Sequence, residues 1–255
     1  MDNSESSKDF SEPSTSVASP GAPPVPRLGI KHIMLWTALS AVLMAVTRTE
    51  RSTLEDIAPN WRLIHAINSA FLCVLTGGML MGAATLLWGR IRIGLRLVSQ
   101  PGHWLLLIFA AENASMFVVS LLVAPQLSIA RLFAVHCLLR VAIVIALSCG
   151  AIFSESRLWK VAFLGPCLLS ALQAGYWASL WAWDEMGFQG WGLKDLRTVT
   201  AWASFAAGLW ITFFAIRDLQ LKTRRDWLHW LGVGGYVAKV TAASLVLLVM
   251  RAFLD

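Results

Sequence analysis

Seven apolar runs, each long enough to cross a bilayer, constrain this chain more than any other feature of its sequence. The runs lie near residues 30–47, 63–88, 104–124, 132–153, 161–183, 199–216 and 228–250. A helix needs about 20 mostly apolar residues to cross the hydrocarbon layer of a membrane. Within that layer every backbone polar group must find its hydrogen bond inside the protein, so helices and closed barrels are the two structures that can span it.

The length and pattern of the runs decide between helices and barrel strands. Barrel strands have about 10 residues and alternate between apolar and polar side chains. The runs here are about twice as long as such strands, and they do not alternate. We therefore predict an all-α fold, a polytopic bundle of transmembrane helices with about seven spans.

The composition excludes the other broad classes of protein. Hydrophobic residues make up 57% of the chain and charged residues 14%, whereas soluble domains have roughly 45–50% and about 25%. A soluble domain of this length would leave too much apolar surface in water, and a disordered chain would carry far less of it. The formal net charge of +6 comes from bases in short loops, where they set orientation in a membrane. We predict the lipid bilayer as a partner and no nucleic acid.

The chain divides into a tail and a membrane domain. Residues 1–27 are rich in Ser, Pro and acidic side chains, and they bury too little apolar surface to offset the entropy of ordering. We predict that this segment is disordered and that residues 28–255 form the transmembrane helical domain. The first run is the weakest, because Lys31 and His32 shorten it. If it lies in the membrane interface, the chain has six spans.

The basic residues also predict the orientation. Segments on the tail's side of the seven spans hold 11 Lys and Arg residues, and those on the other side hold 7. Loops rich in Lys and Arg stay in the cytoplasm. We therefore predict a cytoplasmic N-terminus and a periplasmic C-terminus.

Residues 28–48, LGIKHIMLWTALSAVLMAVTR, resemble the opening of multi-pass membrane proteins from planctomycete-type bacteria. In those proteins a lead similar to Gly-Leu-Lys-His-Leu precedes the first span. The resemblance implies a location in the bacterial inner membrane, and it implies no activity.

Three ionisable residues stand well inside the runs and need an explanation. They are Glu112 in the third run, Arg140 in the fourth and Lys239 in the seventh. A charge at the bilayer centre costs roughly 2.5–3.5 kcal/mol on insertion scales. At about 1.5 Å rise per residue, the three lie within about 7 Å of one another in depth. We therefore predict a charge cluster near the middle of the membrane.

Three interpretations of this cluster remain open. Glu112 and Arg140 can form a structural ion pair that holds two adjacent helices together. Alternatively, Glu112 is a proton or cation site whose charge is tuned by Arg140 and Lys239. Two bases against one acid then either leave an excess positive charge that suits an anionic substrate, or Lys239 is neutral when buried. In the third interpretation the side chains face lipid and extend toward the interface.

Two histidines offer an alternative function. His65 and His136 lie at similar depths in the second and fourth runs, and paired histidines on different helices can ligate a b-type haem. Arg140 follows His136 by one helical turn, on the same face, where it would meet a haem propionate. The other interpretation is that both histidines are interfacial and hydrogen-bonded to neighbours.

Small residues mark faces where helices can approach closely. Gly78 and Gly82 form a GxxxG pattern, and Ala142, Ala146 and Gly150 form a row of small residues at the same spacing. The four cysteines (Cys73, Cys137, Cys149 and Cys167) lie inside apolar runs without zinc-type spacing, so we predict no metal site.

The sequence shows none of the common nucleotide-binding, metalloprotease or nucleophile motifs. Its loops are too short for a soluble catalytic domain. We therefore favour a non-enzymatic membrane protein without a cofactor: a small transporter, or a membrane subunit or assembly factor with a membrane-protein partner. The alternative is a membrane redox protein that binds haem b.

Overall fold

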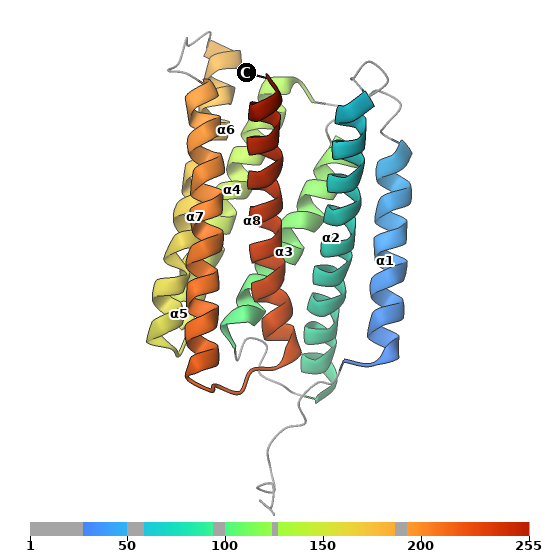
Figure 1. The fold of residues 1–255 in the computed structure, drawn as a ribbon, viewed down its shortest axis with the longest axis vertical. Helices are drawn as coiled ribbons and strands as arrows, with labels where there is room; N and C mark the ends of the chain where they lie inside the picture. The colour runs from blue at the N-terminus through green and yellow to red at the C-terminus, as the bar shows by residue number, and fades with distance from the viewer. Residues whose placement is uncertain (1–27, 50–58, 94–99, 124–126, 187–192, 255) are drawn as a thin grey trace, which may run out of the picture.

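The computed structural model describes residues 28–49, 59–93, 100–123, 127–186 and 193–254, so the predicted disordered tail lies outside the described residues. The described chain forms the helices α1 (Ile30–Thr49), α2 (Pro59–Ile93), α3 (Pro101–Val118), α4 (Ile129–Phe153), α5 (Arg157–Ala162), α6 (Leu164–Met186), α7 (Leu193–Gln220) and α8 (Trp227–Leu254), with a short π-helix, η2 (Val119–Val123), after α3. The long helices stand side by side in one bundle (Figure 1).

Within the described residues, six helical segments are long and apolar enough to cross a membrane, with mean hydropathies between 1.3 and 2.3. They begin with α1, which packs along α2 as an upright member of the bundle (Figure 1). The seventh predicted run forms α8, which has 28 residues and therefore the length to cross as well. The protein is thus an all-α, multi-pass integral membrane protein.

The outer surface of the bundle is apolar, as contact with lipid requires. On α4, Leu138, Ile145 and Ile152 follow one another at seven-residue spacing and are 69%, 59% and 68% exposed. Soluble monomers rarely expose a large contiguous apolar surface of this kind. The exposed face of the bundle therefore matches a hydrocarbon environment.

The helix α3 occupies the inside of the bundle. It packs against α2, α4 and α8, while α7 also packs against α8 and α6 packs along α4. Its residues Leu105 and Leu106 are fully buried, and they belong to the same core as Leu147 of α4 and Tyr236 of α8. Side chains on α3 are therefore surrounded by three other helices.

The fifth predicted run is divided into α5 and α6 at Phe163, just before Gly165 and Pro166. Proline has no N–H to offer the carbonyl one turn earlier, which here belongs to Ala162. The indole N–H of Trp210 on α7 donates to that carbonyl over 3.2 Å. A Cβ at position 165 would lie 2.6 Å from the Trp210 ring, so the glycine admits the indole.

Candidate functional site

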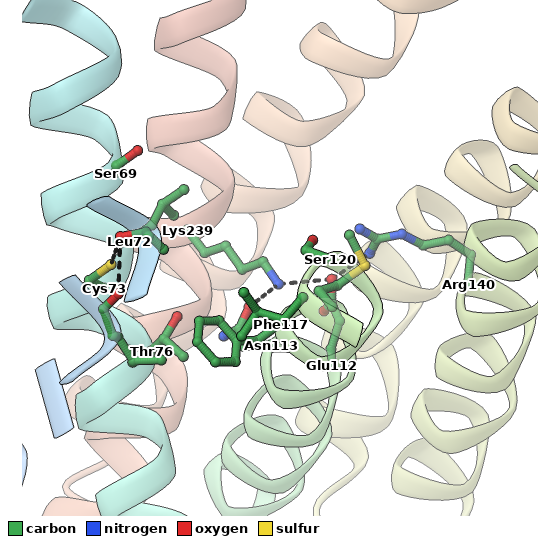
Figure 2. A pocket seen from close by; sticks show the side chains of 14 residues that line it. Ser69, Leu72, Cys73, Thr76, Glu112, Asn113, Phe117, Ser120, Arg140 and Lys239 are labelled. Carbon is green, nitrogen blue, oxygen red and sulfur yellow. Dashed lines mark hydrogen bonds and ion pairs between the residues drawn. The ribbon is translucent and has the colours of Figure 1, made fainter. Parts of the chain in front are cut away.

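The structure brings Glu112, Arg140 and Lys239 together from three helices, α3, α4 and α8. The Glu112 Oε1 atom lies 2.7 Å from the Arg140 guanidinium and 2.8 Å from the Lys239 ammonium. Figure 2 shows the two cationic side chains approaching the carboxylate from opposite sides. We call these three residues the charge cluster.

Neighbouring residues on α3 hold Lys239 in place. Its ammonium donates a hydrogen bond to the side-chain oxygen of Asn113 over 2.9 Å and lies 5.3 Å from the centre of the Phe109 ring. Phe109 in turn packs against Tyr236, one turn before Lys239 on α8, with ring centres 4.8 Å apart. The amide, the aromatic face and the carboxylate together offset the cost of burying this ammonium.

The charge cluster carries one negative and two positive charges, and the two signs are not equally accessible. The Glu112 side chain is 1% exposed, whereas those of Arg140 and Lys239 are 15% and 19% exposed. Both ion pairs use Oε1, and Oε2 has no hydrogen-bond partner among the described residues. The cluster therefore presents an excess of positive charge.

The charge cluster forms one wall of a partly open cavity of about 320 Å³. Asn113 and further polar side chains line it (Thr47, Ser69, Cys73, Thr76 and Ser120), together with the apolar Leu43, Leu72, Met116, Phe117 and Leu121. Figure 2 shows the labelled members of this lining on α2, α3 and η2 around the Lys239 side chain.

The cavity lies toward one end of the bundle. Thr47 is close to the C-terminal end of α1, and Ser120 lies in η2 beyond the end of α3. On the other side of the charge cluster the core is closed by Met79, Phe109 and Tyr236, which are 0%, 3% and 1% exposed. The cavity therefore ends at the charge cluster.

A second polar cluster, which the sequence did not reveal, lies at the opposite end of the bundle. His103 Nε2 on α3 donates to the Asp226 carboxylate, 3.0 Å away, and the Asp218 carboxylate accepts from Arg225 Nε over 2.9 Å. His229 accepts a hydrogen bond from the backbone N–H of Gly102 over 2.9 Å. We call His103, Asp218, Arg225, Asp226 and His229 the end cluster.

Asp226 is the residue that organises this cluster. It stands immediately before α8, where its side chain accepts the backbone N–H of His229 over 2.8 Å, the geometry of a helix N-cap. Burial raises the pKa of the Asp226 carboxyl, but the hydrogen bonds from His103 and from the His229 backbone outweigh burial and hold the pKa below its usual value. The carboxylate is therefore ionised at neutral pH.

The backbones of α3 and α8 touch beside the end cluster. A Cβ at Gly232 would meet the carbonyl of Gly102, and a Cβ at Gly102 would meet the carbonyl of His229. Only glycine allows helices to approach this closely. This end of the α3–α8 pair is therefore closed, in contrast to the end that holds the cavity.

The two histidines of the haem interpretation are placed differently. The Nδ1–H of His136 donates to the Leu132 carbonyl over 2.8 Å, and its ring packs on Trp177 with ring centres 4.5 Å apart. The side chain of His65 lies outside the described residues. Haem binding by this pair therefore stays a prediction.

The small residues serve contacts with several helices of the same chain. A Cβ at Gly78 would lie 2.9 Å from Trp36 on α1, and one at Gly82 would lie 2.6 Å from Leu231 on α8. In the row formed by Ala142, Ala146 and Gly150 on α4, two residues face the interior of the bundle. Gly150 is buried and Ala146 packs against the core, whereas Ala142 is exposed.

Comparison of the chain with protein-family models, with curated proteins and with solved structures finds no match. The function must therefore be inferred from the charge cluster, the cavity and the end cluster.

Proposed function

We propose that this protein is a small, non-enzymatic transporter of the bacterial cytoplasmic membrane, and that the cavity is its solute site. The position of the charge cluster on the cavity wall carries this proposal. An ion pair with a purely structural role needs no access to a cavity, yet Arg140 and Lys239 both line one and are partly exposed. A solute in the cavity therefore meets charged groups near the middle of the bundle, where secondary transporters bind their substrates.

The asymmetry of the bundle supports the same proposal. The cavity opens toward one end and stops at the charge cluster, and the packed layer of Met79, Phe109 and Tyr236 follows. Beyond that layer, the end cluster joins α3 to α8. One-sided access of this kind is expected of a transporter in one state of an alternating-access cycle. With the N-terminus in the cytoplasm, the cavity faces the periplasm.

Flux through purified protein in proteoliposomes tests the proposal. Uptake would be measured for a panel of radiolabelled inorganic ions, amino acids, sugars and organic acids, first with the wild-type chain and then with Glu112→Gln. We expect uptake of at least one solute by the wild-type chain. Glu112→Gln is expected to reduce this uptake at least tenfold, because it changes the net charge that the solute meets at the charge cluster and so the free energy of moving the solute past the bilayer centre.

Asp184→Asn provides the control. It also removes a carboxylate, but an exposed one at the end of α6 that belongs to neither cluster. Folded Asp184→Asn protein is expected to retain uptake. If folded wild-type protein moves no member of the panel and instead co-purifies with a stoichiometric membrane partner in mild detergent, transport is excluded and the role of a membrane subunit takes its place.

A further inference from the structure

The wall that a solute would meet at the bottom of the cavity is cationic. Arg140 and Lys239 reach the cavity from opposite sides, and the carboxylate between them is almost sealed from it. Lys239 retains a second partner in Asn113, and Arg140 has Glu112. An anion entering the cavity would therefore meet two partly exposed hydrogen-bond donors, and it could bind to both while each keeps its existing partner.

The remainder of the cavity has both polar and apolar walls. The hydroxyl groups of Ser69, Thr76 and Ser120 supply hydrogen-bond donors and acceptors, and Leu72 and Phe117 supply apolar contact (Figure 2). Ligand sites of small molecules are mostly apolar, with a few polar groups that fix orientation. This lining suits a solute with one charged head and a short apolar tail.

The volume of the cavity indicates how large a solute it encloses. A cavity of about 320 Å³ equals roughly ten times the 30 Å³ that a water molecule occupies in the liquid. It therefore accommodates a molecule with about ten non-hydrogen atoms. A carboxylic acid with a chain of about six carbons, or one with a single aromatic ring, has about this size.

The net charge of the cluster selects for a single negative charge. One acid and two bases leave an excess of one positive charge, which one bound monoanion neutralises. A neutral complex costs less in a low-dielectric interior than a charged one. A divalent anion, a neutral molecule or a cation would each leave the loaded site charged.

From these four observations we infer that the cavity binds small monocarboxylates with an apolar tail. The solute carboxylate lies on the cavity side of Arg140 and Lys239, next to the Glu112 carboxylate that they share, and the tail lies toward Leu72 and Phe117. Glu112 sets the selectivity by neutralising one of the two bases. This inference rests on the proposed transport function for the movement of the solute, whereas binding itself requires only the cavity and the charge cluster.

Binding to the full chain in lipid nanodiscs tests the inference by isothermal titration calorimetry with three probes of nearly equal size. Hexanoate is expected to bind at least tenfold more tightly than the neutral hexanamide and the cationic hexylammonium. The charged hydrogen bonds that separate hexanoate from the other two support a difference of this size. Equal binding of the three probes, or preference for hexylammonium, would overturn the inference.

Variants of the charge cluster provide a second test. Lys239→Gln and Arg140→Gln each remove the excess positive charge and are expected to weaken hexanoate binding at least tenfold, whereas Lys239→Arg retains the charge and the binding. Glu112→Gln raises the excess charge and is expected to bind hexanoate at least as tightly as the wild type. Binding of hexylammonium that is lost in Glu112→Gln and unaffected in Lys239→Gln would instead indicate a cation site and refute the inference.

The binding and flux measurements separate the two proposals. Hexanoate binding without flux of any solute supports the site and refutes transport. Flux of another solute, with no hexanoate binding, supports transport and refutes the inference. Flux and selective binding of hexanoate together, both reduced by Lys239→Gln, support both.

Discussion

Removing the Glu112 carboxylate is expected to destabilise the bundle, because it leaves Arg140 and Lys239 without a shared anion. Breaking a buried ion pair by removing one partner costs about 3–5 kcal/mol. The lower end, about 3 kcal/mol, applies here, since the two cations remain 15% and 19% exposed and can be hydrated from the cavity. For a chain of this size, that loss corresponds to a decrease in Tm of about 6–12 °C.

The two bases also make the effects of substitution non-additive. Lys239→Gln leaves the pair between Glu112 and Arg140 but loses the ion pair with Glu112 and the hydrogen bond to Asn113. The loss of a hydrogen bond from a charged donor costs about 1.5–3 kcal/mol. Combined with Glu112→Gln, the same change removes one of the two unpaired cations. The double variant Glu112→Gln/Lys239→Gln is therefore expected to be no less stable than Glu112→Gln alone.

Thermal unfolding in mild detergent, followed by the fluorescence of the 13 tryptophans, measures both quantities. Asp184→Asn, an exposed carboxylate at the end of α6, serves as the control that removes a negative charge without touching the cluster. The reasoning is refuted if the Tm of Glu112→Gln equals that of Asp184→Asn, or if the double variant loses the sum of the two single effects.

Three further predictions concern other parts of the bundle. Gly232→Ala is expected to cost about 1–3 kcal/mol, because its Cβ would meet the Gly102 carbonyl, whereas Gly234→Ala enters open space and leaves the Tm unchanged or raises it; equal Tm values would exclude the close approach. The pKa of Asp226 is lowered in the folded protein, so its ionised carboxylate stabilises the fold above the ordinary carboxyl pKa of about 4, and this stabilisation declines as the pH falls below that value. In thermal scans between pH 6 and 3, the Tm of Asp226→Asn should therefore fall less steeply with pH than that of the wild type. An identical dependence of Tm on pH would contradict this reasoning. A membrane-impermeant thiol reagent is expected to label Cys73, which lines the cavity, from the periplasm, and faster with an anionic reagent than with a cationic one; labelling from the cytoplasmic side alone would reverse the proposed orientation.

The charge cluster was predictable because a charge inside an apolar run is costly in free energy, so such residues are rare and easily recognised in a sequence. Glu112, Arg140 and Lys239 each interrupt a run, and helix rise alone places them at similar depth. The sequence predicts that Lys239 lies at the same depth as the other two, but not that its ammonium shares one Glu112 oxygen with Arg140, because that contact depends on α8 packing beside α3. The cavity depends in the same way on how α1, α2, α3 and α8 are arranged.

The end cluster illustrates why the remainder was not predictable. His103, Asp218 and Asp226 stand near the ends of apolar runs, where polar residues are ordinary and suggest solvent. Their burial, between 1% and 9% exposed, follows from the packing of α3 against α8 at Gly102 and Gly232. Neither glycine belongs to a GxxxG pattern on its own helix, so no local signal marked the contact.

The backbone contact between Gly102 and Gly232 has a mechanical consequence for the rest of the bundle. Because the two backbones already touch there, α8 can tilt relative to α3 only by pivoting about that point. Lys239 lies about 10 Å further along α8, so a tilt of about 10° displaces its backbone by about 2 Å. That displacement is comparable with the 2.8 Å that separates its ammonium from Glu112. A small rotation of α8 at one end of the bundle is thus sufficient to make or break the ion pair between Lys239 and Glu112.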